Sequence, residues 1–307
     1  MKFTIYQESR VGKRQGNEDR IAYCYSREAL LLVVADGMGG HLHGEVAAQI
    51  GVQFITEAFQ REAKPNLADP IMFLTAAITN AHNAILDYAA DRLLPEAPRT
   101  TCVACVVQDS VAYWAHVGDS RLYAIRGDKV LAQTRDHSRV QRMVDDGQIT
   151  AEEALVHPAR NRIYSCLGGV QPPQIDFSKK TALATGDILV LCTDGVWGPL
   201  PGQEIITAMS GGNVMQAAPA LLNLAEAKGG PNADNLSIIA MRWEEDYTGD
   251  TLGSVSTHTL PVDSFTTQME AFAKSGRKGG NPVPNLTDEE IERAIEEINT
   301  AIKKFTK

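Results

Sequence analysis

Residues 29–40 read ALLLVVADGMGG, an apolar run that ends abruptly at Asp36-Gly37. A short run without polar side chains is typical of a strand that is buried on both faces, and Asp-Gly is a common turn. The sequence therefore predicts a carboxylate at the end of a buried strand. Glycine beside it lets the backbone approach a neighbouring group closely.

The same arrangement of an acidic residue beside an apolar segment recurs along the chain. Each occurrence alone is explained by an ordinary turn aspartate. A cluster of carboxylates would be mutually repulsive, and a hard divalent cation removes that repulsion by binding carboxylate and carbonyl oxygens. Taken together with Asp36, the other occurrences therefore favour a site for a divalent metal. They lie in RQGNED at 14–19, HVGDSR at 116–121, LCTDG at 191–195 and ADN at 233–235.

Hydrophobic spacing predicts a body of mixed strands and helices. Helical spacing of apolar residues indicates helices at 44–61, 70–88, 203–208 and 214–227. The polar stretch 136–168 carries several arginines and short helical pieces. Strands are expected at 3–8, 21–25, 29–35, 101–107, 111–117, 122–126, 129–133, 175–183, 187–192 and 236–243.

Composition changes after residue 243, which predicts one domain followed by an appendage. Residues 244–285 are rich in Thr, Ser, Gly, Asp and Pro and are predicted to be a flexible linker. Residues 286–307 are predicted to form an amphipathic helix, with Ile291, Ile295 and Ile302 on one face. That face needs a partner, and we expect the helix to dock on the body or on a partner protein.

Charge and hydropathy exclude several classes of protein. The formal net charge is −9, so nucleic-acid binding is not expected. No apolar run approaches the ~20 residues that span a bilayer, and residues 1–10 lack the apolar stretch of a signal peptide. We expect a cytoplasmic protein without a membrane partner. Cys102 and Cys105 lie three apart on an expected strand and should face opposite sides, which disfavours a zinc or redox pair.

These motifs, in this order, resemble those of the metal-dependent PP2C (PPM) protein phosphatase family, bacterial type. The resemblance covers about residues 1–243 and rests on R-x-x-N-E-D, A-D-G-M-G-G-H-x-x-G-E, G-D-S-R, T-D-G and D-N. It implies an α+β fold: a four-layer αββα sandwich, in which two antiparallel β-sheets are flanked by helices.

The resemblance also implies a centre of two Mn²⁺ or Mg²⁺ ions. By motif match, Asp36 bridges both metals. Glu18 and the Gly37 carbonyl hold one metal, and Asp194 and Asp234 hold the other. The two cations would activate a bridging water that attacks the phosphorus atom in line with the leaving oxygen.

Two other metal-site assignments follow from the same resemblance. Asp19 would support the site through water. Asp119, together with Asp194, matches a third, weaker metal position of bacterial-type members.

Two further residues are candidates for catalysis. Arg14 matches the phosphate-binding arginine of the family, and a guanidinium can hold two phosphate oxygens. Met38 stands where eukaryotic members carry a histidine, and methionine cannot donate a proton. His41 or a metal-bound water is then the candidate general acid, while a structural role for His41 near the following helix is the alternative.

The implied function is hydrolysis of phosphoserine and phosphothreonine in proteins, which reverses a bacterial Ser/Thr kinase in cytoplasmic signalling. Phosphorylated proteins, including such a kinase and its substrates, are the expected partners. Two alternatives stay open at this point: an inactive metal-binding scaffold for phosphoproteins, and a hydrolase of small phosphate esters.

Overall fold

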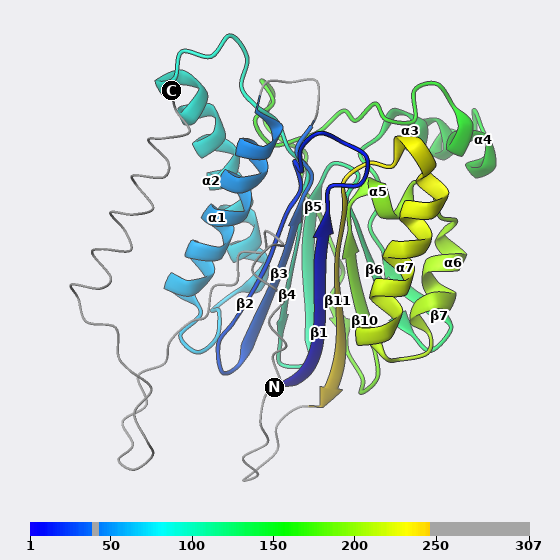
Figure 1. Ribbon diagram of the computed structural model, residues 1–307. Coiled ribbons are helices and arrows are strands. Elements are labelled where there is room, and N and C mark those ends of the chain that lie inside the picture. Colours follow the sequence, from blue (N-terminus) through cyan, green and yellow to red (C-terminus); the bar gives the residue numbers. More distant parts are fainter. Residues whose placement is uncertain (39–42, 246–307) are drawn as a thin grey trace. The chain divides into compact units, whose positions relative to one another are not determined.

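A computed structural model describes residues 1–38 and 43–245 of the chain. Two antiparallel β-sheets lie face to face (Figure 1). One sheet has the order β1 (Lys2–Arg10), β11 (Leu236–Glu245), β10 (Ile188–Cys192), β6 (Arg121–Arg126) and β7 (Lys129–Gln133). The other has the order β2 (Arg20–Tyr25), β3 (Ala29–Ala35), β4 (Cys102–Gln108), β5 (Val111–Val117) and β8 (Asp176–Phe177), and β9 (Thr181–Ala182) also pairs with β5.

Helices cover the outer face of each sheet, as Figure 1 shows. On the β2–β3–β4–β5 sheet lie α1 (Gly44–Glu62) and α2 (Pro70–Asp91); Asp69 caps α2 by accepting from Ile71 and Met72. The other sheet is covered by α5 (Asp194–Trp197), α6 (Gly202–Met209) and α7 (Val214–Gly229), and η1 (Gly230–Asn232) follows α7. Between β7 and β8 lie α3 (Arg139–Asp145) and α4 (Ala151–Val156). The predicted αββα sandwich is confirmed.

Strand β3 shows why residues 29–35 do not alternate between polar and apolar side chains. Leu30, Leu32 and Val34 pack into the core between the two sheets. Leu31 and Val33 point to the other face, where α1 and α2 cover them. Every residue of β3 is buried, so both faces must be apolar.

The predicted strand at 175–183 is wrong in its continuity, because the structure breaks it into β8 and β9. Ser178 lies between them. Its backbone N–H donates to the Trp114 carbonyl, and its Oγ accepts from the Trp114 N–H. The Ser178 hydroxyl thus accepts the hydrogen bond from Trp114 that a backbone carbonyl would accept in a continuous strand.

The prediction for Cys102 and Cys105 is confirmed. Cys102 packs with α1 and α2, while Cys105 packs between the sheets, so the two thiols face opposite sides of β4. All five cysteines are free thiols.

The predicted linker and C-terminal helix, 244–285 and 286–307, lie outside the described residues from residue 246 on. Within the part that the structure describes, no helix has the length and hydropathy needed to cross a bilayer.

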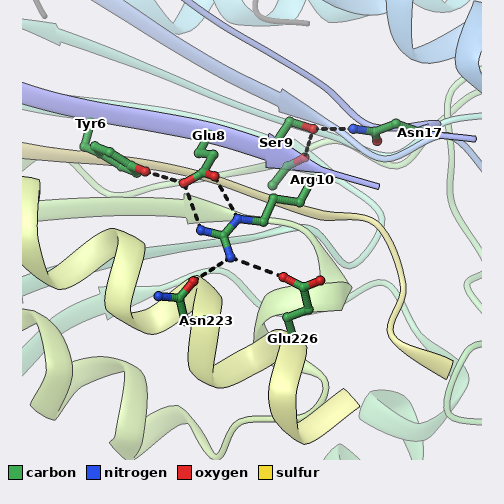
Figure 2. A network of polar contacts seen from close by, with 8 residues as sticks. Tyr6, Glu8, Ser9, Arg10, Asn17, Asn223 and Glu226 are labelled. Carbon is green, nitrogen blue, oxygen red and sulfur yellow. Dashed lines mark hydrogen bonds and ion pairs between the residues drawn. The ribbon is translucent and has the colours of Figure 1, made fainter. Parts of the chain in front are cut away.

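An ion-pair network fixes α7 against the end of β1 (Figure 2). Arg10 donates from Nε to Glu8 at 2.7 Å and from Nη1 to Asn223 at 2.8 Å and Glu226 at 3.2 Å. Tyr6 donates to the same Glu8 carboxylate. These contacts hold β1 in place immediately before the loop that carries Arg14.

The packing of α1 against α2 predicts a measurable stability difference between two phenylalanines. Phe59 is fully buried and meets Phe73 edge to face at 6.0 Å, whereas Phe54 of the same helix is 43% exposed. Phe59→Ala should lower the free energy of unfolding by about 3–5 kcal/mol, because it leaves a cavity. The matched control Phe54→Ala should lower it by less than about 1 kcal/mol. Urea denaturation of both variants measures this, and equal losses would contradict the packing.

Candidate metal centre

The acidic residues meet because they all lie at one end of the two sheets. In antiparallel sheets, the ends of strands that run one way lie beside the starts of strands that run the other way. Asp36 follows β3, Asp119 follows β5 and Asp194 follows β10, whereas Glu18 precedes β2 and Asp234 precedes β11. The register pairs Arg20 with Ala35 and Cys192 with Arg121, which places these ends side by side. In Figure 1, β1 runs toward this edge, whereas its antiparallel neighbour β11 runs away from it.

A cavity of about 540 Å³ opens where these strand ends converge. The structure brings together here all but two of the residues predicted for the site. The exceptions are Asp19, which is buried beside the cavity, and His41, which lies outside the described residues. The lining includes Arg14, Glu18, Asp36, Gly37, Met38, Thr101, Asp119, Asp194, Asp234 and Asn235.

Backbone hydrogen bonds fix Asp36 and Gly37. Thr101 Oγ1 accepts from the Asp36 N–H at 3.1 Å, and Thr100 Oγ1 donates to the Asp36 carbonyl at 2.8 Å. The Gly37 N–H donates to the Glu18 carbonyl at 3.2 Å. A Cβ on Gly37 would lie 2.5 Å from the Gly44 backbone and 2.7 Å from the Glu18 carbonyl oxygen. Only glycine allows this approach of three segments.

Crowded carboxyls raise one another's pKa. Burial, followed by Asp19, Asp194, Asp119 and Asp234, raises the pKa of Asp36 well above its usual range. Burial and then Asp234 raise the pKa of Asp194 to about 6. The pKa of Asp119 is also raised well above its usual range, first by burial and then by Asp194. The cluster therefore costs free energy at neutral pH unless positive charge enters it.

Glu18 provides a direct test of whether a cation fits. Its Oε2 is buried and has no hydrogen-bond partner among the described residues. Burial, and then the nearby Glu45, raises the Glu18 pKa. A buried carboxylate oxygen without a donor is expensive, and a hard cation satisfies it. The cavity lined by Glu18, Asp36, Asp119, Asp194 and Asp234 thus has the all-oxygen donor set that Mg²⁺ and Mn²⁺ prefer.

Asp19 lies behind the cavity in a chain of hydroxyl groups that the sequence did not reveal. Thr193 Oγ1 donates to Asp19 Oδ2 at 2.8 Å and accepts from the Ser237 N–H. Ser237 Oγ lies 2.7 Å from Ser9 Oγ, which accepts from the Asn17 amide; the Ser9 and Asn17 part is seen in Figure 2. Burial raises the pKa of Asp19 to about 7, while the Ser237 and Thr193 hydroxyls oppose that shift.

Arg14 lies at the edge of the cavity and pairs with an acid of the cluster. Its Nη2 is 2.6 Å from Asp234 Oδ2, and its side chain is 57% exposed. The hydrogen bond to Asp234 raises the Arg14 pKa, so the guanidinium stays charged. Arg14 therefore places a fixed positive charge beside the acids, within reach of solvent.

A second group of possible ligands, His116, His137 and Asp176, lies outside this cavity. Its hydrogen bonds disfavour a metal ion. His137 Nδ1 accepts from the Gly118 N–H at 3.2 Å, so the proton of the neutral ring is on Nε2, which lies 3.2 Å from Asp176 Oδ2. A protonated nitrogen cannot ligate a metal. The acidic cavity is the candidate metal centre.

Comparison with known proteins agrees with this geometry. Residues 7–212 match the family described as Protein phosphatase 2C. The Ser/Thr protein phosphatase PstP of Mycobacterium tuberculosis is 34% identical over 227 residues, which are 74% of this chain and 42% of that protein. This chain thus spans less than half the length of that relative.

Two further matches extend over almost the whole length of the related protein. A putative protein phosphatase 2C-type protein of Streptococcus pyogenes is 31% identical over 236 residues, 76% of this chain and 94% of that protein. The crystal structure of the PstP catalytic domain in complex with two manganese ions has a TM-score of 0.67 and 30% identity, and the match covers 79% of this chain and 99% of that one. With its strand-end acids in one cavity and this extent of similarity, the chain belongs to the protein phosphatase 2C family.

Proposed function

We propose that this protein hydrolyses phosphoserine and phosphothreonine in other proteins, with two Mn²⁺ or Mg²⁺ ions held by the acidic cluster. The observation that carries this proposal is the convergence of five carboxylates and one exposed arginine on a single cavity. The similarity to PstP, which was crystallised with two manganese ions, supports the choice of cation.

The division of the metal ligands follows the motif match to the protein phosphatase 2C family. Asp36 has the most acidic neighbours and would serve both ions. Glu18 and the Gly37 carbonyl would hold one ion, and Asp194 and Asp234 would hold the other. Asp119 would hold a third, weaker ion together with Asp194. When bound, such ions acidify a water molecule and neutralise phosphoryl charge.

The remaining residues of the cavity bind and orient the substrate. Arg14 presents paired N–H donors to the phosphate of the substrate. Its present partner, Asp234, is one of the proposed metal ligands, so Arg14 would be freer to bind phosphate when Asp234 holds a cation. Met38 lines the cavity and supplies no proton. Protonation of the leaving oxygen is therefore proposed for His41 or for a metal-bound water.

A groove beside the cavity favours a protein substrate over a small ester. It has a volume of about 840 Å³ and shares Arg14, Asn161, Asp194 and Asp234 with the metal cavity. Its lining includes Val140 and Val144 of α3, together with Trp197 of α5 and Leu200. A chain that places a phosphorylated side chain beside Arg14 would continue into this groove, whereas a small ester would leave it unused.

The proposal extends to partners and domains. Phosphorylated substrates of a bacterial Ser/Thr kinase, and the kinase itself, are the proposed partners. Residues 1–243 would form the catalytic domain, 244–285 a linker and 286–307 a docking helix. An inactive scaffold is less well supported, because every acid of the proposed centre is present and lies at the cavity or directly behind it.

The proposed centre predicts metal-dependent activity. Hydrolysis of p-nitrophenyl phosphate should require Mn²⁺ or Mg²⁺ and stop on addition of EDTA. Asp36→Asn and Asp194→Asn should each lower kcat at least about 100-fold, because ligand loss removes several kcal/mol of transition-state stabilisation. Asp128→Asn, in the exposed turn between β6 and β7, is the matched control and should keep full activity. Equal turnover by all four proteins would refute the assigned mechanism.

The raised pKa values predict how stability depends on pH. Folded Asp19 and Asp194 bind protons with pKa values of about 7 and 6, whereas aspartate in an unfolded chain titrates near ~3.9. Between these values the folded state holds more protons, so the free energy of unfolding of the metal-free protein falls as pH rises from about 4 to about 7.

Thermal unfolding at pH 5–8 tests that sign. In EDTA the Tm should fall across this range, and Mn²⁺ should restore it at pH 8. Asp36→Asn should raise the Tm of the metal-free protein at pH 8, because it removes one repelling charge. A metal-free wild type that becomes more stable between pH 6 and pH 8 would show that the acids do not repel as described.

The groove predicts a residue that discriminates between substrates. Arg160 is exposed and is among the residues that line the groove, while Arg162, which is nearby and also exposed, is not. Arg160→Ala should lower kcat/KM for an acidic phosphopeptide about two- to fivefold, as for an exposed ion pair of ~0.2–1 kcal/mol. Its turnover of p-nitrophenyl phosphate should not change, and Arg162→Ala should affect neither substrate. A proportional loss on both substrates would argue against the groove.

A further inference from the structure

His137 lies outside the metal cavity, yet it makes paired contacts with the turn that carries Asp119. Its backbone N–H donates to the Gly118 carbonyl at 2.9 Å. Its ring Nδ1 accepts from the Gly118 N–H at 3.2 Å. Both backbone polar groups of Gly118, the residue immediately before the acid, are thus bound by a single residue.

Gly118 cannot move away from this contact toward the sheet. Its φ is +100°, and a Cβ there would lie 2.6 Å from the Thr101 side chain. Thr101 is in turn hydrogen-bonded to the Asp36 N–H at 3.1 Å and to Ser120 Oγ at 2.7 Å. The turn is therefore held between Thr101 on one side and His137 on the other.

The His137 ring is itself fixed in orientation. It stacks on His116 with ring centroids 4.7 Å apart and lies against Tyr164 at 5.5 Å. His116 Nε2 bonds the Arg135 carbonyl at 2.7 Å. The His137 side chain is 1% exposed, and its Nε2 faces Asp176 at 3.2 Å. A ring so enclosed keeps its Nδ1 aimed at Gly118.

The same residue closes the segment between β7 and β8. The His137 carbonyl accepts from the Tyr164 N–H at 2.9 Å, and the adjacent Ser138 forms an isolated bridge with Ile163. The Arg139 N–H donates to the Arg162 carbonyl at 2.8 Å. The two ends of the segment that contains α3 and α4, residues 137–139 and 162–164, therefore meet beside the turn that carries Asp119.

We propose that His137 is a positioning residue that holds Asp119 in the metal centre by binding the backbone N–H and carbonyl of Gly118, and that it acts as a neutral imidazole with its proton on Nε2. This rests on the proposed function only in that Asp119 is taken as a ligand of the weakest metal ion. Groups that orient a ligand in this way contribute about 10- to 100-fold to metal affinity in other metalloproteins.

Two substitutions separate the acceptor from the bulk of the ring. In His137→Asn, the amide oxygen can take the place of Nδ1 and accept from Gly118. In His137→Gln, the amide reaches the place of Nε2 and leaves the Gly118 N–H without its acceptor. Both remove the aromatic ring and its stacking on His116, so a purely structural role predicts equal effects.

Mn²⁺ binding is measured by electron paramagnetic resonance of the free ion, which does not depend on activity. The weakest Mn²⁺ site should bind about tenfold more weakly in His137→Gln, and within about twofold of wild type in His137→Asn. Thermal unfolding should show similar losses of Tm for both variants. Equal weakening of Mn²⁺ binding in both, or none in either, would overturn the proposal.

A measurement on the unaltered protein keeps the test decisive even if a variant fails to fold. Long-range ¹H–¹⁵N correlation of the metal-free full chain should show His137 with its proton on Nε2, and the Gly118 amide should be protected from hydrogen exchange. A proton on Nδ1 would overturn the proposal. Failure of the wild type to hydrolyse p-nitrophenyl phosphate with Mn²⁺ would refute the proposed function instead, while these two observations would stand.

Discussion

Electrostatic repulsion among the strand-end acids is the constraint on which the rest of the structure depends. Burial and neighbouring carboxylates raise the pKa of Asp36, Asp119 and Asp194, so the folded chain holds these groups together at a cost. A fold can sustain that cost only if its frame is rigid. Here the frame consists of two sheets that enclose an apolar core between them and whose outer faces are covered by helices.

Close backbone approach is the second consequence of that constraint. The acids come from loops far apart in the sequence, and their side chains are short, so the loops themselves must touch. Gly37 packs against Gly44 and the Glu18 carbonyl without room for a Cβ, and a Cβ on Gly195 would lie 1.9 Å from the Asn235 carbonyl oxygen. Glycine beside an acid in these motifs is thus a requirement of packing as well as of turn formation.

Much of this arrangement could be predicted from sequence because the informative signals are local. The apolar run at 29–35 and the turn after it predict strand β3 and the position of Asp36 without any tertiary information. The hydroxyl chain from Asp19 through Thr193 and Ser237 could not be predicted, because serine and threonine at the ends of strands carry no signal of their own. The break at Ser178 was missed for a similar reason, since a side-chain hydrogen bond across two strands replaced a backbone one.

Arg14 shows how the same electrostatics connect structure to chemistry. Its guanidinium bonds Asp234, so the arginine offsets part of the repulsion in the cluster. Cations bound among the acids would take over that role and weaken the hold of Asp234 on the arginine. A phosphate would then find a charged donor already at the edge of the cavity, at little cost in side-chain order. Cation binding would therefore have two results: it would neutralise the acids, and it would free Arg14 to bind the substrate phosphate.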